Sequence, residues 1–150
     1  MKISEKAVHI IGELLSLPEP PEEGLAPWIK VIGVLASKIK TADQQKVLIP
    51  YLQELLNNKN TQETRKVGQR ILFTAALNLG EEGLNKEPTY LKMMKSVFHD
   101  NNYKLRRDGV IFFKEYLIGS NAETICKSSR FEDTYLPELL DFCEDEDLHI

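Results

Sequence analysis

One pattern of apolar residues occurs twice in this sequence and begins a third time. The first copy covers 51–80: it opens with a tyrosine-leucine pair, passes through a polar turn and ends at Gly80. The second copy runs from Tyr90 to Gly119, and a third start follows at Tyr135. Units of roughly 40 to 47 residues with two helices each are typical of stacked helical repeats. The spacing therefore predicts pairs of helices that stack on one another.

Length and composition fit three to four such units in one domain over 1–150. The 150 residues are 42% hydrophobic and 28% charged, which is enough to bury a core and unlike a disordered chain. The net charge of −4 argues against a dedicated nucleic-acid binder, but leaves room for a local basic face. Cys126 and Cys143 are far apart and form no CxxC motif, so we expect two free thiols in a reducing compartment.

No segment has the composition of a membrane span or a secretion signal. The apolar runs are all shorter than the roughly 18 residues that a membrane helix needs, and residues 1–6 are too charged for a signal peptide. We therefore expect a cytoplasmic or nuclear protein.

Helical periodicity, capping residues and breakers predict about seven helices and no strands. The helices are expected at 4–16, from Pro27, from Thr41, at 61–79, at 88–99, from Asn101 or Asn102 to Gly119, and from 133 or 134 to 142. A longer connection should cover 120–132, with one turn at 122–127.

Several positions within these helices carry a more specific expectation. Pro27 suits the first turn of the second helix, which is apolar most of the way round and should be buried on two sides. Trp28 in that helix is expected to anchor the core, with a ligand-facing role as the alternative. The third helix should start with a capping box at Thr41 and be kinked or split by Pro50. Asn60 is expected to cap the fourth helix.

The predicted core combines aliphatic positions from both full units with the aromatic residues of the sixth helix. Phe112, Phe113 and Tyr116 cannot all face one core, so they are expected to be buried between consecutive repeats, or else to line a groove for a peptide. The aliphatic positions expected to be buried are Leu52, Leu55, Ile71, Leu72, Leu91, Met94, Val110 and Ile111.

The second helix of each unit carries an arginine followed by a glycine three positions on, as Arg65 and Gly68 and as Arg106 and Gly109. In the second unit an aspartate, Asp100, stands in the preceding turn. This arrangement resembles the HEAT-repeat pattern. In that family the arginine and aspartate tie neighbouring turns together, and the small residue lets the paired helices approach.

The resemblance covers roughly 42–150 and implies an all-α fold, a right-handed α-solenoid of HEAT/armadillo-like helix pairs. The first two helices fit only as a degenerate or capping unit. The stretch 89–103 followed by 129–146 is also faintly similar to the HEAT subunits that associate with cohesin. No family within the class is identified by these residues.

The sequence offers no constellation for catalysis or for a bound cofactor. His9, His99 and His149 are scattered, and none has a second histidine or a cysteine at metal-ligand spacing. His99 is expected to cap the end of the fifth helix, where a cation is favoured. Cys143 near His149 lacks a glycine turn that could stabilise an oxyanion. We therefore expect a protein that is not an enzyme, with no catalytic residue, no cofactor and no metal ligand.

Basic residues gather at two turns and in the helices that follow them. If the units stack, these residues form a ridge, which we interpret either as helix starts with structural arginine–aspartate pairs or as a docking strip for an acidic partner or a phosphate backbone. The members of this basic ridge are Lys59, Arg65, Lys66, Arg70, Lys104, Arg106, Arg107 and Lys114.

These observations favour a non-catalytic scaffold for protein–protein interactions, whose concave face of second helices grips an extended peptide or a partner domain. The alternative is a fragment of a larger chromosome-associated, cohesin- or condensin-like, or phosphatase-regulatory HEAT subunit, with the basic ridge contacting nucleic acid or phosphate.

The end of the chain falls inside a third unit. Asp145 follows Tyr135 at the interval at which Asp100 follows Tyr90, so a second helix should come next. A solenoid needs a polar terminal cap. We therefore expect either a fragment of a longer repeat protein or an end that is covered by another chain. The helix in 133–150 should be the least stable one, and the protein should self-associate through this end.

Overall fold

The computed structural model describes residues 6, 9–10, 13, 22–120, 123, 127 and 129–146. All regular secondary structure in this part of the chain is helical, which confirms the predicted all-α class. The helix expected over 4–16 and the turn expected at 122–127 fall largely outside the described residues. None of the described helices is long and apolar enough to cross a membrane.

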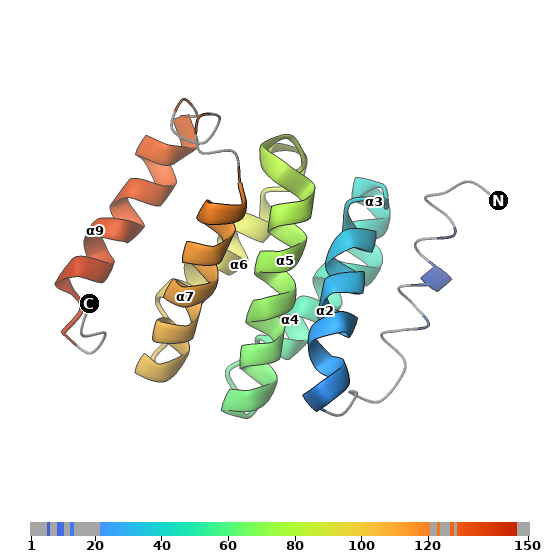
Figure 1. Cartoon of the computed structure of the whole chain (residues 1–150), viewed down its shortest axis with the longest axis horizontal. Helices are drawn as coiled ribbons and strands as arrows, with labels where there is room; N and C mark the ends of the chain where they lie inside the picture. Colours follow the sequence, from blue (N-terminus) through green and yellow to red (C-terminus); the bar gives the residue numbers. More distant parts are fainter. Residues whose placement is uncertain are drawn as a thin grey trace.

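The helices lie in two layers (Figure 1). In chain order the elements are α2 (Glu22–Ala36), α3 (Thr41–Asp43), the π-helical turn η1 (Gln44–Leu48), α4 (Ile49–Leu55), α5 (Gln62–Lys86), α6 (Thr89–Phe98), α7 (Tyr103–Gly119), the π-helical turn η2 (Phe131–Tyr135) and α9 (Leu136–Glu144). Helices α2, α5 and α7 stand side by side in one layer, with α4 and α6 behind them. Helix α9 comes after α7 at the C-terminal end of the row. The predicted second helices α5 and α7 therefore share a layer.

Of the three predicted N-terminal caps, only the one at the start of α7 is confirmed. Asn102 caps α7 as expected, because its Oδ1 accepts a hydrogen bond from the backbone N–H of Lys104 at 2.9 Å. The cap of α5 is Thr61 rather than Asn60: the Thr61 hydroxyl accepts from the backbone N–H of Thr64. Asn60 instead donates from Nδ2 to carbonyls at the end of α4. Its side chain thus closes the preceding helix and is not available for the next one.

The expected capping box at the start of the third helix is also wrong. Thr41 is already helical, and the residue before it makes no side-chain cap. Gln44 is instead buried, and its Nε2 donates to the carbonyl of Ala36, the last residue of α2, and to that of Ile39 just after it. Its Oε1 accepts from the Tyr90 hydroxyl at 3.0 Å. The amide therefore joins the end of α2 to α6, which accounts for a buried polar residue in this position.

Two prolines follow π-helical turns. Pro50 splits the predicted third helix, as expected, into η1 and α4. Proline lacks an N–H and its ring crowds the carbonyl four residues earlier, so a wider turn accommodates it. Pro137 stands at the equivalent place, in the first turn of α9 directly after η2. Helical structure here is already present at 129–130, earlier than the predicted start at 133 or 134. Pro27 does not lie in the first turn of its helix, because α2 begins at Glu22.

Helix α5 continues beyond its predicted end. Gly80 breaks the helix with φ of 66° and ψ of −177°, a conformation that side-chain-bearing residues rarely adopt. A further helical segment then runs to Lys86, whereas the sequence predicted an end at 79. Leu84 in this segment is fully buried, which explains why the chain folds back onto the core here.

The predicted core is mostly correct, with one clear error in α7. Leu52, Ile71, Leu72 and Met94 are buried, and Leu55, Leu91 and Val110 pack against them while partly exposed. Ile111, however, is 45% exposed. The buried side of α7 is formed by Leu105, Gly109, Phe113 and Tyr116, and Ile111 points away from that side.

Helix α2 is not buried on two sides, because Val31 and Val34 are both exposed. Its buried side carries Ile29 and Ile32, and Trp28 packs against this core while remaining partly exposed. The interpretation of Trp28 as a core residue is therefore confirmed.

Aromatic rings fill the space between the last helices. The Phe98 ring in α6 lies 5.0 Å from that of Phe113 in α7 and 5.1 Å from that of Phe142 in α9. Tyr116 and Tyr135 complete the cluster with a T-shaped contact at 6.0 Å. The expected burial is confirmed for Phe113 and Tyr116, whereas Phe112 is only partly buried. Such clusters of large rings contribute much of the buried apolar area.

Candidate functional site

Two arginines of the predicted basic ridge hold aspartates in the turns after the next helices. Arg65, at the start of α5, donates from Nη1 to both carboxylate oxygens of Asp100, at 3.0 and 3.2 Å. Arg106, at the start of α7, binds Asp145 with its Nε 2.9 Å from Oδ2. Arg106 Nη1 also donates to the backbone carbonyl of Asp100 at 2.8 Å. The two contacts are therefore of the same kind, one unit apart.

These pairs are partly withdrawn from solvent. The side chains of Arg65 and Asp100 are 13% and 16% exposed, and those of Arg106 and Asp145 are 15% and 20% exposed. The guanidinium of Arg106 is held by a carboxylate and by carbonyls at a helix end. Arg65 donates to its carboxylate from Nη1 alone, and its buried Nε has no hydrogen-bond partner among the described residues. Arg65 and Arg106 thus hold the fold together, as in the structural interpretation of the ridge.

A glycine lies three residues after each of these arginines, where two helices come closest. A Cβ atom built on Gly68 would lie 3.0 Å from Cβ of Leu55 in α4. A Cβ atom on Gly109 would lie 2.6 Å from Cγ1 of Val97 in α6. In each unit the glycine of the second helix therefore permits close approach to the first helix, as the sequence predicted.

The other six ridge residues are more accessible. Lys66 lies 3.7 Å from Asp108, an exposed contact of low energetic weight. Arg70 is half-buried and lines a small groove between α5 and α7 together with Phe112 and Glu115. The exposed members are Lys59, Lys66, Lys104, Arg107 and Lys114. The ridge therefore divides into two structural arginines and a set of cations that can meet a partner.

Three of the exposed cations share one side of α7 with two exposed isoleucines. The spacing of these five residues is alternately three and four, which places them along one helix face. Ile118 is 72% exposed, the most of the large hydrophobic residues described. We call this surface the α7 stripe, and it consists of Lys104, Arg107, Ile111, Lys114 and Ile118. The sequence analysis missed its aliphatic part because it placed Ile111 in the core.

A buried polar cluster joins α5, α7 and η2 on the other side of the aromatic core. The hydroxyls of Tyr116 and Tyr135 are 2.8 Å apart, and both lie within hydrogen-bond distance of Glu81 Oε1. Arg130 binds Glu81 and Asn85. Burial raises the pKa of the Tyr135 hydroxyl well above its ordinary value, and it raises that of Tyr116 as well. The cluster satisfies polar groups that would otherwise be unpaired inside the protein, and no sequence motif pointed to it.

A second buried group lies between η1 and α6. Glu87 Oε1 accepts hydrogen bonds from the hydroxyl and the backbone N–H of Thr89, and Oε2 accepts from Gln45 Nε2. The hydrogen bond from the Thr89 side chain is the main reason that the pKa of Glu87 lies below its ordinary value. Burial raises the pKa of the neighbouring Tyr90 hydroxyl, and the charge of Glu87 adds to this effect. Both groups serve to fix α6 against η1.

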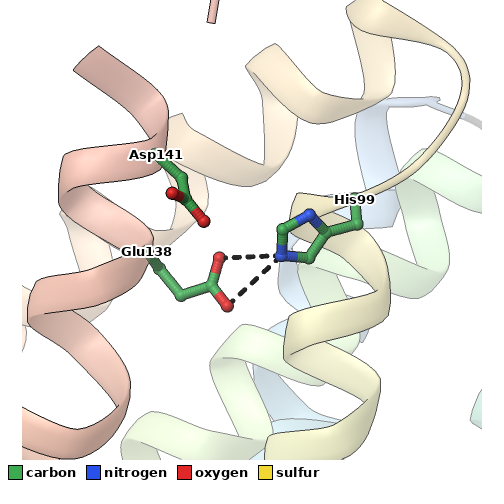
Figure 2. Close-up of side chains that lie close together, drawn as sticks. All are labelled: His99, Glu138 and Asp141. Carbon is green, nitrogen blue, oxygen red and sulfur yellow. Dashed lines mark hydrogen bonds and ion pairs between the residues drawn. The ribbon is translucent and has the colours of Figure 1, made fainter. Parts of the chain in front are cut away.

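One histidine lies against two carboxylates at the end of α6. His99 follows α6, as predicted, and its backbone N–H donates to the carbonyl of Lys95. Its ring faces the carboxylate of Glu138 on α9, and Asp141 lies one turn further along the same helix (Figure 2). No metal site was expected from residue spacing, because His99 and Glu138 are 39 positions apart in the sequence. Cys143 is exposed in the same helix, whereas His149 lies outside the described residues.

Comparison with protein-family models, with curated proteins and with solved structures found no match to this chain.

Proposed function

We propose that this chain is a right-handed α-solenoid of HEAT/armadillo-like helix pairs that works as a non-catalytic scaffold for protein–protein interactions. The observation that carries the proposal is the recurrence of one contact between units, Arg65 with Asp100 and Arg106 with Asp145. Helix pairs that were not structurally equivalent would not be expected to form the same arginine–aspartate ion pair at the same position. The recurring glycine contacts support the same reading. Repeats that contact only their neighbours leave long continuous faces for partners.

The α7 stripe is the surface we propose for partner binding. Its three cations are exposed, and the two isoleucines between them offer apolar area that water would otherwise cover. In the described part of the chain, the ion pairs of the basic ridge involve only Arg65, Lys66 and Arg106. The cations of the stripe are therefore available to an incoming ligand. The matching partner is an extended or helical peptide that combines acidic with aliphatic residues.

The proposal is tested by selecting peptides from a random displayed library against the whole protein. We expect enrichment of peptides that contain both Asp or Glu and Leu, Ile or Val. Charge reversal at Lys104, Arg107 and Lys114 should weaken their binding by at least about tenfold, the factor that 1.4 kcal/mol corresponds to.

The matched control reverses three exposed lysines elsewhere, Lys30, Lys38 and Lys46, and should retain binding. Circular dichroism should show that both triple variants remain helical. Enriched peptides without acidic residues, or equal loss in both variants, would remove the α7 stripe from consideration.

The same variants also test the alternative function, which is nucleic-acid binding. If the basic ridge contacts a phosphate backbone, duplex DNA should bind the wild-type protein with an affinity that falls steeply with salt. The variant with charge reversal at Lys104, Arg107 and Lys114 would then lose that affinity, and the peptide selection would give no consensus.

A further inference from the structure

The cluster of His99, Glu138 and Asp141 joins α6 to α9 outside the proposed binding surface. One ligand atom from each side chain can be chosen so that all three lie within 4.8 Å of one another. The His99 ring and both carboxylates point into the same space between the two helices (Figure 2). Nitrogen and carboxylate oxygen together form a donor set that suits Zn²⁺ and related divalent transition-metal ions.

Glu138 is the unusual member of the cluster. Its side chain is only 8% exposed, although a buried carboxylate is costly unless it is paired. Its Oε2 has no hydrogen-bond partner among the described residues. That oxygen lies 3.1 Å from Nε2 of His99, close enough for an ion pair but without the alignment of a hydrogen bond. An unsatisfied oxygen on a buried side chain, aimed at a ring nitrogen, is a position that a cation would stabilise.

The separation between His99 and Glu138 matches that of two ligands on one metal ion. Tetrahedral Zn²⁺ with bonds of about 2.0–2.2 Å to nitrogen and oxygen holds its ligand atoms about 3.3–3.5 Å apart. His99 Nε2 lies 3.1 Å from one oxygen of Glu138 and 3.4 Å from the other. Asp141 is exposed, so its side chain is free to change rotamer and complete the set.

The surroundings are also negative. The same pocket is also lined by Asp100, Glu144 and Asp145, and the only arginine among the described residues of its lining is Arg106. Arg106 is bound to Asp145, and Arg65 to Asp100. The carboxylates of Glu138 and Asp141 lie beside His99, and Glu144 lines the same pocket. A pocket of this kind raises the local concentration of cations.

We propose that His99, Glu138 and Asp141 bind one divalent transition-metal ion of the Zn²⁺ class, and that this ion fastens α9 to the end of α6. The ion is structural or regulatory: it bridges a helix of one unit to the turn of the preceding one. Three protein ligands leave a fourth position for water or for a group from another molecule. The competing arrangement is a direct ion pair between protonated His99 and Glu138, with no role for a metal.

The experiment measures Zn²⁺ binding by isothermal titration calorimetry. Cys126 and Cys143 are first replaced by serine, so that no thiolate contributes. We expect one Zn²⁺ per chain, and loss of at least about tenfold in affinity for both His99→Asn and Asp141→Asn, since even outer-shell changes at metal sites cost that much. Glu144→Gln removes a carboxylate that lines the same pocket but is not a proposed ligand, so it should lower the affinity far less than either ligand substitution.

Two further readouts separate a built site from loose charge attraction. Co²⁺ in place of Zn²⁺ should give the visible absorption of a tetrahedral nitrogen–oxygen site, and the His99→Asn variant should lose it. Hydrogen exchange should show α9 protected on addition of Zn²⁺ in the parent protein but not in Asp141→Asn. Both ligand variants change exposed side chains, so they are expected to fold. Equal Zn²⁺ affinity in the parent, His99→Asn and Asp141→Asn proteins, or no binding at all, would overturn the proposal in favour of the direct ion pair.

Discussion

Removing the contact between Arg106 and Asp145 tests how strongly one helix pair holds the next. Arg106 makes two short charge-assisted hydrogen bonds, at 2.9 Å to the Asp145 carboxylate and at 2.8 Å to the Asp100 carbonyl. Each such bond contributes about 1.5–3 kcal/mol when it is buried, and less when solvent reaches it. Because the two side chains are 15% and 20% exposed, we expect Arg106→Ala to lower the free energy of unfolding by about 2–3 kcal/mol.

A double-mutant cycle isolates the part of this energy that belongs to the pair. Arg106→Ala, Asp145→Ala and the double variant are unfolded in urea and followed by circular dichroism. We expect a coupling free energy of about 1–2 kcal/mol, between the values for exposed and for buried pairs. The melting temperature of Arg106→Ala should fall by roughly 4–12 °C for a domain of this size.

The Glu82–Lys86 pair provides the control. Its side chains are 87% and 64% exposed and stand four residues apart on one helix. The same cycle there should give a coupling of about 0.3–0.5 kcal/mol. If the Arg106–Asp145 coupling is no larger than this, the arginine does not tie the units together, and the main support for the proposed solenoid is lost. Peptide binding by the folded Arg106→Ala protein should remain intact, because Arg106 is outside the α7 stripe.

Two further predictions concern the core and the buried tyrosines. Leu72→Ala should lower the free energy of unfolding in urea by about 2–5 kcal/mol, because Leu72 is fully buried; a loss below about 0.5 kcal/mol would contradict its place in the core. The pKa values of Tyr90 and Tyr135 are raised in the folded protein. Above pH of about 10 the unfolded state therefore loses its phenolic protons first, and the free energy of unfolding falls as the pH rises. The expected slope is about 1.4 kcal/mol per pH unit for each of these tyrosines. The measurement uses a Tyr51→Phe, Tyr103→Phe background, because Tyr103 is exposed and Tyr51 is only partly buried. There phenolate absorbance should rise together with the loss of helical circular dichroism, and Tyr90→Phe should reduce the slope; phenolate formation at full helicity in this background would contradict the prediction.

The helical class, most helix positions and much of the core followed from local sequence. Helical periodicity marks the side of each helix that is buried, which is why Leu52, Leu72 and Met94 were found correctly. Gly80 was predicted as the end of α5, but it interrupts α5, which continues to Lys86. Asn102 was assigned correctly, because an N-cap depends only on the backbone next to it. These are short-range effects that a chain carries wherever it folds.

The arginine–aspartate contacts were expected only from the resemblance to the HEAT-repeat pattern. The interval from Tyr135 to Asp145 matches that from Tyr90 to Asp100, and both aspartates proved to bind an arginine of the preceding second helix. A repeat allows this inference because equivalent positions of successive units have equivalent neighbours. Sequence alone could not separate these structural arginines from the accessible cations of the ridge, since both sets lie at helix starts.

What only the tertiary structure decided is how each helix is rotated and what lies opposite it. Ile111 is apolar and still faces solvent, because the rotation of α7 is set by the larger rings of Phe113 and Tyr116 on its other side. The meeting of His99 with Glu138 depends on the approach of α9 to the end of α6, across 39 residues of chain. Local sequence determines which residues share a helix face. Contacts between helices depend on crossing angles and on packing of the whole core, which no single segment encodes.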